Sequence, residues 1–296
     1  MTRNKTVLLA LAAVLSLSLF AGGCRKLEAR DNLNKGVQAF KAAKYNEAVE
    51  FFKTAIELDP EYPTARLYLA TAYMSQYIPG AESPENLAYA KNALDNFQQV
   101  LETDPNNAQA VESIASLYYL QAQGTPKLED KIARLGEAEK WYKRLTEVEP
   151  TRKEAWYSLG VIAWAKWYPA WMEARTKAGM KPEAPGPLKD KKTREELSAK
   201  YLEMINEGIK NLEKALELDA EYDDAMAYMN LLIRERADLA ENQAGHDADI
   251  EAADRWMQKA LETRKIKAER QRKARGIDSE KTKEGSEPAL PDAALK

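Results

Sequence analysis

The chain has 296 residues, enough for one long helical array or two ordinary domains. With 45% hydrophobic and 31% charged residues it can bury a core, and its 13 glycines and 13 prolines exclude collagen-like and proline-rich disordered proteins. The net charge of −3 gives no argument for nucleic acid as a partner, and a single cysteine and a single histidine exclude intramolecular disulfides, zinc fingers and multi-histidine metal sites.

The first residues have the three regions of a secretory signal peptide. Arg3 and Lys5 precede an uncharged, mostly apolar run of about 15 residues, which ends in small residues before Cys24. The run is shorter than the roughly 20 residues that a helix needs to span a bilayer, which disfavours the alternative of an uncleaved N-terminal anchor. We therefore expect residues 1–23 to be cleaved and residues 24–28 to form a tether.

Cys24 directly follows Ala21-Gly22-Gly23, and this arrangement resembles the lipobox of bacterial lipoproteins, with Ala21 at the usual position of Leu. The resemblance implies that Cys24 becomes the N-terminus and carries a diacylglyceryl thioether and, usually, an N-acyl chain. Two or three acyl chains tether a protein to a membrane permanently. Similar lipoproteins retained in the inner membrane often have Asp where this chain has Arg25, so we expect a lipid anchor in the bacterial outer membrane, facing the periplasm.

A segment recurs along the rest of the chain with a fixed spacing. Three copies end in prolines that lie 45 residues apart and a fourth ends in alanine: AIELDP at Pro60, VLETDP at Pro105, LTEVEP at Pro150 and ALELDA at Ala220. An amphipathic helical stretch lies on each side of every copy, which is typical of stacked helical hairpins.

Small and large residues around these segments resemble the tetratricopeptide repeat, whose period is 34 residues. The matching positions keep one register: Gly36, Ala70, Ala115 and Gly160 in the first helix of a unit, Ala48, Ala93, Ala138, Gly208 and Ala253 in the second, and Phe52, Phe97, Tyr142, Leu212 and Met257 one turn later. The resemblance implies an all-α, tetratricopeptide-like solenoid of about five helical hairpins. We expect an array over residues 29–265, with units at about 29–62, 63–107, 108–152, 153–222 and 223–265.

The 45-residue spacing predicts lengthened helices, because the 11 residues beyond the family's period are three turns that return side chains to nearly the same face. Ser83-Pro84-Glu85 supplies an N-cap and a first-turn proline for an early start of the second helix in the second unit. In the third unit the second helix is expected between Pro126 and Val148, while Ile78-Pro79-Gly80 indicates a loop.

The fourth unit has a long insertion at about residues 166–200. Trp164, Trp167 and Trp171 share one helix face there, although we expect Pro169 to kink or end that helix and the proline-rich half that follows to be a surface loop. The tryptophans either pack the insertion onto the array or form an exposed patch for a partner or the membrane interface. Burial of their rings distinguishes the two alternatives.

The sequence offers little for catalysis. Phosphate-binding loops and nucleophile elbows are absent, and His246 is expected to be a solvated loop histidine that lacks enough partners for a metal site. We expect no cofactor, no metal and no enzymatic activity. Residues 266–275 form a basic helix end, either solvated or in contact with anionic lipid or an acidic partner, and residues 276–296 are expected to be a disordered tail.

The repeat resemblance implies a concave groove lined by the first helix of each unit. Together with the insertion, it gives these candidate partner-binding residues: Leu33, Val37, Phe40, Met74, Tyr119, Tyr157, Trp164, Trp167 and Trp171. Leu33 and Val37 replace the Lys and Asn with which some family members clamp a peptide carboxylate, so a carboxylate-clamp role is disfavoured.

These patterns favour a membrane-tethered scaffold that binds protein or peptide partners in the envelope. By analogy of fold, it resembles lipoproteins of outer-membrane barrel and pilus secretin assembly. One alternative is an envelope enzyme with a site in residues 164–200, which buried carboxylates beside the tryptophans would favour. Another is membrane-surface binding through the tryptophans and the basic helix end. Nucleic acid is not an expected partner, and the oligomeric state stays open.

Overall fold

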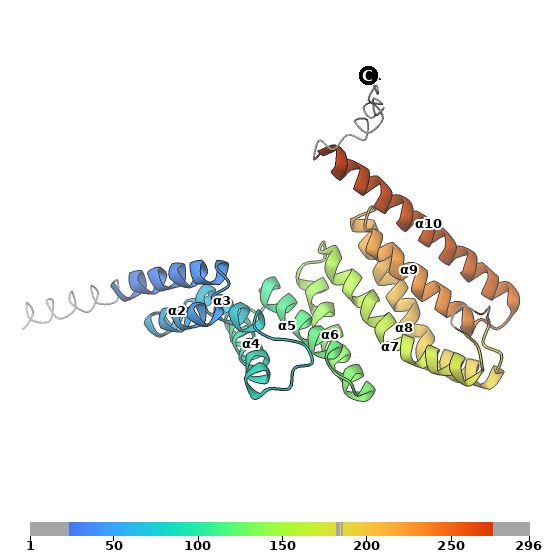
Figure 1. Cartoon of the computed structure of the whole chain (residues 1–296), viewed down its shortest axis with the longest axis horizontal. Helices are drawn as coiled ribbons and strands as arrows, with labels where there is room; N and C mark the ends of the chain where they lie inside the picture. Colours follow the sequence, from blue (N-terminus) through green and yellow to red (C-terminus); the bar gives the residue numbers. More distant parts are fainter. Residues whose placement is uncertain (1–23, 182–183, 185, 275–296) are drawn as a thin grey trace, which may run out of the picture.

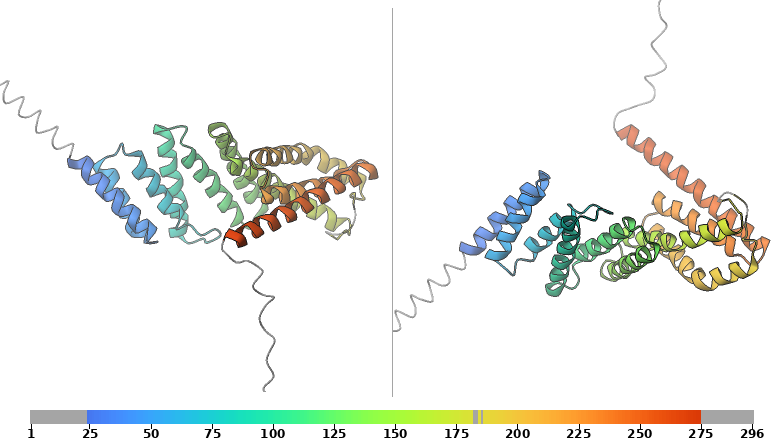
Figure 2. Two further views of the ribbon diagram at one scale, coloured as in Figure 1. Left: turned by 90° about the horizontal axis from the view of Figure 1, so that it is seen from above. Right: turned by 60° about the horizontal axis from the view of Figure 1, so that its bottom comes forward.

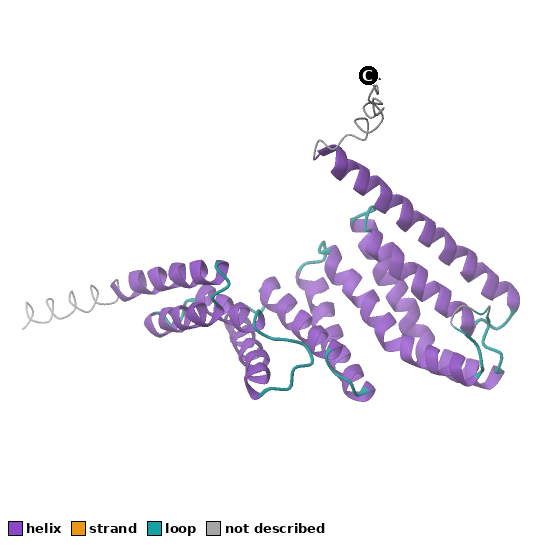
Figure 3. Ribbon diagram, viewed as in Figure 1, coloured by secondary structure: helices purple, strands orange, loops and turns teal. Residues whose placement is uncertain are grey.

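The computed structural model describes residues 24–181, 184 and 186–274. Within them, ten α-helices follow one another and pack in consecutive pairs (Figures 1 and 3). This arrangement confirms the predicted all-α solenoid of about five hairpins. The expected signal peptide at 1–23 and the expected tail at 276–296 lie outside the described residues. None of the described helices has an apolar stretch long enough to span a bilayer.

The first three pairs join helices of moderate length. They are residues 24–41 with α2 (Tyr45–Leu58), α3 (Pro63–Met74) with α4 (Pro84–Thr103), and α5 (Ala108–Gln123) with α6 (Leu128–Val148). The backbone N–H of Asn86 donates to the hydroxyl of Ser83 at 3.2 Å, so α4 starts at its predicted N-cap. A β-carbon at Gly36 would collide with the ring of Phe52, which shows why a small residue is needed where the first two helices meet.

The last two pairs contain the longest helices. They are α7 (Lys153–Lys177) with α8 (Lys191–Leu218), and α9 (Asp223–Arg236) with α10 (Gln243–Ala274), with the short 3-10 helix η1 (Ala237–Leu239) after α9. Much of the expected insertion extends α7 and α8, and residues 178–190 connect them. Met180 and Leu188 in this connection are buried, so the connection also contributes to the core.

Pro169 lies inside α7 and does not end it, contrary to one of the two expectations from the sequence. An interior proline removes a helix hydrogen bond at a cost of about 3 kcal/mol. The neighbouring rings of Trp167 and Trp171 are buried against α8, α9 and the connection, and each such burial contributes roughly 2 to 3 kcal/mol. Tertiary packing therefore offsets the local cost.

The core consists of three clusters along the array: one in the first pair and α3, one in the middle, and one in the last two pairs. Tyr73 contacts the first and middle clusters, and Trp156 and Trp164 contact the middle and last clusters. In all views the helix of residues 24–41 and α10 lie at opposite ends of an elongated molecule (Figures 1 and 2).

Candidate binding surface on the first helices of the pairs

The nine candidate residues divide between the interior and the surface. Leu33, Trp167 and Trp171 are buried, and the other six are half-buried. Leu33 belongs to the first core cluster, against which Val37 and Phe40 pack, and Met74 packs against the middle cluster. The candidates of the first two pairs therefore contribute mainly to packing.

The tryptophans of the insertion follow the packing alternative. The ring of Trp167 is fully buried, 5.3 Å from the ring of Tyr201 on α8, and its Nε1 has no hydrogen-bond partner within the described chain. Trp171 is 8% exposed and donates from Nε1 to Asp238 Oδ2 at 2.7 Å. Neither ring is therefore available as an exposed patch, and only Trp164 keeps a partly exposed face.

The remaining candidates gather on one surface. Tyr119 on α5, Tyr157 and Trp164 on α7, Tyr228 on α9 and Tyr222 just before α9 are all half-buried, and we call these five residues the aromatic surface. The ring of Tyr157 lies 5.0 Å from that of Tyr222 and 5.7 Å from that of Tyr228, while Trp164 lies 5.6 Å from Tyr228. The two contacts of Tyr228 are nearly perpendicular, which is the edge-to-face geometry that aromatic pairs favour.

The tyrosine hydroxyls of the aromatic surface remain protonated at neutral pH. Burial raises the pKa of Tyr119, Tyr157, Tyr222 and Tyr228, and the carboxylate of Asp224 adds to the rise at the last three. Tyr228 also raises the pKa of Tyr119. Tyr119 packs against the middle core cluster, as does Trp164. The surface thus offers hydroxyl donors beside broad apolar ring faces.

Sequence reasoning missed Tyr222 and Tyr228. The fifth unit matches the repeat pattern least well in its first helix, where Asn230 occupies the small-residue position. For Tyr222 a signal was available: a tyrosine directly precedes the first helix in both the second and the fifth pair, as Tyr62 and Tyr222.

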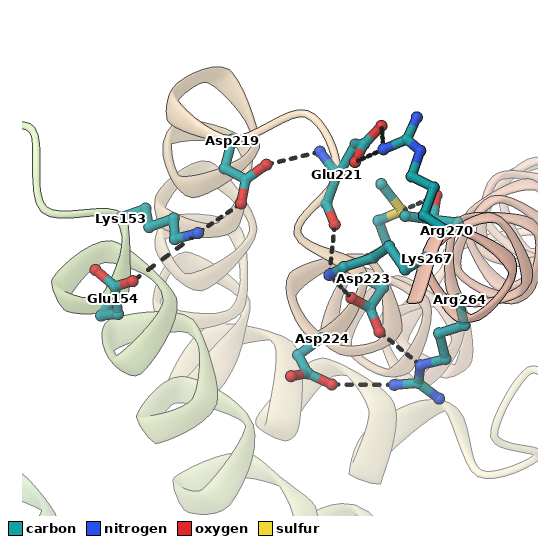
Figure 4. Close-up of polar contacts among 11 residues, drawn as sticks. Lys153, Glu154, Asp219, Glu221, Asp223, Asp224, Arg264, Lys267 and Arg270 are labelled. Carbon is teal, nitrogen blue, oxygen red and sulfur yellow. Dashed lines mark hydrogen bonds and ion pairs between the residues drawn. The ribbon is translucent and has the colours of Figure 1, made fainter. Parts of the chain in front are cut away.

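Ion pairs fix the turns beside this surface (Figure 4). Lys153 Nζ at the start of α7 lies 2.5 Å from Asp219 Oδ2 and 4.8 Å from the ring centroid of Tyr222. Arg152 NH1 lies 2.8 Å from Glu112 Oε2 on α5. These partly exposed ion pairs link α5, α7 and the α8–α9 turn beside the aromatic rings, and each contributes modestly.

The basic helix end is engaged by carboxylates on α9 and the turn before it (Figure 4). The side chain of Asp223, which is 14% exposed, lies 2.5 Å from Lys267, and Arg270 lies 2.7 Å from Glu221. Arg264, just before the basic helix end, also lies 2.8 Å from Asp223. Carboxylates of the same chain therefore neutralise part of the positive charge at the end of α10. This end is neither fully solvated nor fully available to anionic lipid.

Behind the aromatic surface, Glu235 near the end of α9 is buried. Trp164 Nε1 donates to Glu235 Oε1 at 2.9 Å, while Oε2 has no hydrogen-bond partner within the described chain. Burial raises the pKa of this carboxyl to about 8; the hydrogen bond from Trp164 lowers it in part, and the nearby carboxylate of Asp238 raises it further. Glu235 is therefore mostly a neutral acid at pH 7.

Asp238 is the centre of a second buried polar group. Arg175 on α7 donates to Asp238 Oδ2 at 2.5 Å and to the carbonyls of Lys181 and Ala184 in the α7–α8 connection at 2.6 and 2.5 Å. A β-carbon at Gly186 would collide with the Asp238 carboxylate, so the connection can lie this close only with glycine there. The group ties the inserted connection to η1.

His246 is 5% exposed, and the expectation of a solvated histidine is wrong. It lies in the first turn of α10, where its Nδ1 is 2.9 Å from Asp247 Oδ1, and its ring packs beside Gly186. The connection between α7 and α8, distant in sequence, covers it. Local sequence near a helix start could not show this.

The described residues contain no cluster of three or more metal-ligating side chains. Two surface cavities lie apart from the aromatic surface. One of about 590 Å³ runs along α8 from Ser198 to Lys210, and one of about 440 Å³ lies between α8, η1 and α10. Asp238 and Glu235 are buried carboxyl groups near the tryptophans, as the enzyme alternative predicts. Both accept hydrogen bonds from structural side chains: Glu235 from Trp164, and Asp238 from Trp171 and Arg175.

Comparison with known proteins identifies the repeat. A family model described as "TPR repeat" matches residues 40–76, and no curated protein matches the sequence. The structure is similar to a crystal structure of MamA protein, with 14% identity, a TM-score of 0.50 and coverage of 82% of this chain and 94% of that one. It is also similar to MamA residues 41 to the end from Desulfovibrio magneticus RS-1, with 15% identity, a TM-score of 0.51 and coverage of 81% and 96%. At these identities the likeness shows the fold alone. The chain therefore contains a tetratricopeptide repeat and has the fold of a tetratricopeptide-repeat protein.

Proposed function

We propose that this protein is a lipid-anchored scaffold of the bacterial envelope that binds protein or peptide segments on its aromatic surface. The observation that carries the proposal is the convergence of Tyr157 and Trp164 on α7 with Tyr228 on α9 onto one half-exposed surface. Tyr119 on α5 packs against the same core cluster as Trp164. Tyrosine and tryptophan dominate the binding energy of protein interfaces, because each gives a large rigid contact area together with a polar group.

The chemistry of the surface favours an extended segment with apolar side chains. Ring faces accept apolar groups, and protonated tyrosine hydroxyls donate to backbone carbonyls. Because the rings already pack against one another, little side-chain entropy is lost when a partner binds. Assembly of outer-membrane, pilus or secretion complexes is the process that we assign to such a scaffold, by analogy of fold.

The anchor is proposed from the first residues. The signal-peptide regions and the small residues before Cys24 support lipidation there, and Arg25 supports the outer membrane. Cys24 is exposed and begins the described part of the first helix. The aromatic surface lies away from this end, on α5, α7 and α9, so the anchor leaves it accessible (Figure 1).

The alternatives lose specific support. Membrane-surface binding needs exposed tryptophans, but Trp167 and Trp171 are buried, and two cations of the basic helix end, Lys267 and Arg270, are paired. The enzyme alternative is left with buried carboxylates that bind structural partners. We therefore propose no reaction.

The scaffold proposal is tested by in-cell crosslinking and mass spectrometry on the lipoprotein purified from membranes. We expect the double variant Tyr119→Ala/Tyr228→Ala to lose at least about tenfold of the crosslinked partner, because two anchor rings are removed. Tyr118→Ala is the matched control, since it removes a half-buried tyrosine next to Tyr119 but on another face of α5. Thermal unfolding of each variant checks that the fold is kept. Equal partner recovery from the double variant and the control would reject the aromatic surface as the binding site.

A further inference from the structure

The last described helix has an apolar stripe that no other described segment covers. Ile250 is half-buried, Met257 is 41% exposed, Leu261 is 57% exposed and Ala268 is exposed. Their spacings of seven, four and seven residues place them along one flank of α10, and we call these four residues the α10 stripe. No described helix lies beyond α10, which is outermost at its end of the array (Figures 1 and 2).

The preceding pairs show that this flank is a packing surface. Phe52, Phe97, Tyr142 and Leu212 occupy the position of Met257 in the second helices of the first four pairs, and each is at most 8% exposed. Leu101 and Leu216, at the position of Leu261, are 8% and 9% exposed. In each of those pairs the first helix of the next pair packs against the second helix. The α10 stripe therefore consists of apolar residues at positions that a following helix covers in the other pairs, but no described helix follows α10. The outer face of a terminal repeat is usually polar instead.

The charges of α10 are divided between its two halves. Residues 243–258 contain four carboxylates and one lysine or arginine, whereas residues 259–274 contain seven such cations and two carboxylates. Lys265, Arg272 and Lys273 in the second half form no ion pair within the described residues. In the first half, Asp249 and Asp254 pair with Arg236 and Arg234 on α9, whereas Asp247 and Glu251 are exposed and pair only with neighbours on α10. A partner for this flank should therefore be basic opposite the first half and acidic opposite the second.

A second α10 in the antiparallel direction has this distribution. We propose that the α10 stripe binds the α10 stripe of a second copy of the chain, about a two-fold axis at residue 259. In that register Met257 faces Leu261, and Ile250 faces Ala268, because the stripe is symmetric about residue 259. The acidic first half of each helix faces the basic second half of the other. A parallel pair would place like charges side by side. The contact is isologous and closes as a dimer.

Analytical ultracentrifugation of residues 24–296, which contain every described helix, tests the proposal. Cys24→Ser prevents a disulfide at the exposed cysteine. We expect a monomer–dimer equilibrium, and Leu261→Glu should weaken it at least about tenfold, because it places a carboxylate at the apolar centre. Ile266→Glu is the matched control: Ile266 is also exposed, at 39%, but lies on another face of α10, so we expect a change of less than about twofold.

Disulfide trapping tests the direction of pairing. A Met257→Cys chain and a Leu261→Cys chain, both with Cys24→Ser and with different mass tags, should form mainly the mixed disulfide. Predominant like-with-like disulfides would overturn the antiparallel register.

The dimer itself is tested by the ultracentrifugation. A monomer at all concentrations up to about 0.2 mM, or equal effects of the two glutamate variants, would overturn the dimer. A chain that ends at residue 274 is measured as well. If it dimerises while the longer chain stays monomeric, the chain's own C-terminal segment covers the stripe, and the proposal is wrong.

Discussion

Two carboxyl groups, one turn apart, show how strongly the surroundings decide the chemistry of a residue. Asp238 has the guanidinium of Arg175 at 2.5 Å and the indole of Trp171, so its charge is compensated. Glu235 accepts one hydrogen bond from a neutral indole and has no ion pair within the described chain. A buried carboxyl without a cation stays protonated, because ionisation there is costly.

Glu235 should therefore make the stability of the fold depend on pH. Its unfolded carboxyl ionises near 4.5 and its folded carboxyl near 8, so between these values only the folded state retains the proton. The stabilising contribution is full below about pH 4.5 and is lost as pH rises through 8. At about 1.4 kcal/mol per pKa unit, the full loss is on the order of 5 kcal/mol. Glu235→Gln lacks this loss, so we expect its stability relative to the parent chain to rise between pH 5 and 8.5.

Urea unfolding at several pH values measures this difference. Glu241→Gln, at an exposed position in the turn before α10, is the control, and its curve should run parallel to that of the parent chain. A Glu235→Gln curve that also runs parallel between pH 5 and 8.5 would show that Glu235 does not titrate as described.

At this scale the sequence predicts only what local patterns decide. The N-cap at Ser83 and the small residue at Gly36 follow from neighbouring residues and from the repeat register. The burial of His246 and the pairing of Asp238 could not be predicted, because both depend on the α7–α8 connection, more than 50 residues earlier in the chain. Buried polar residues are fixed by tertiary contacts that a periodicity does not encode.

At the scale of elements, the repeat period predicts the helix pairs and their lengthening, but it does not predict where each helix ends. Pro169 has a strong local preference against a helix interior, yet α7 continues to Lys177 because its aromatic face is buried. The basic end of α10 shows the same dependence on context. Its run of cations predicts a solvated or lipid-binding helix end, but some of these cations form ion pairs with carboxylates on α9.

This pairing predicts that the end of α10 frays when its cations are removed. In Arg264→Met/Lys267→Met, we expect backbone amides of residues 262–274 to exchange hydrogen about three to ten times faster, because half-exposed ion pairs of this kind contribute modestly. Hydrogen exchange with mass spectrometry measures the rates. Lys265→Met/Lys273→Met removes the same charge from residues without ion pairs in the described chain and should leave the rates nearly unchanged. Equal acceleration in both variants would attribute the effect to net charge.

At the scale of the whole molecule, the proposed site exists only because the solenoid brings distant first helices together. The sequence identified Tyr119, Tyr157 and Trp164 through their repeat positions, but it did not identify Tyr228, which lies between Tyr157 and Trp164. Curvature decides whether α5 and α9 face each other, and lengthened repeats do not inherit the curvature of the family's standard period. Position within a repeat is therefore predictable, whereas the neighbours across repeats need the three-dimensional arrangement.

The position of the anchor leads to the last prediction. If Cys24 is acylated, the N-terminal peptide of the protein isolated from membranes begins at Cys24 and carries the mass of two or three acyl chains, which is enough for a permanent tether. Cys24→Ala should lack this mass and incorporate no labelled palmitate, whereas Arg25→Ala should retain both, because it leaves the thiol in place. An uncleaved N-terminal anchor gives the opposite result: the parent chain and Cys24→Ala would share an unmodified N-terminus and the same membrane fraction. Mass spectrometry of the N-terminal peptide, rather than fractionation alone, therefore distinguishes the two modes of attachment.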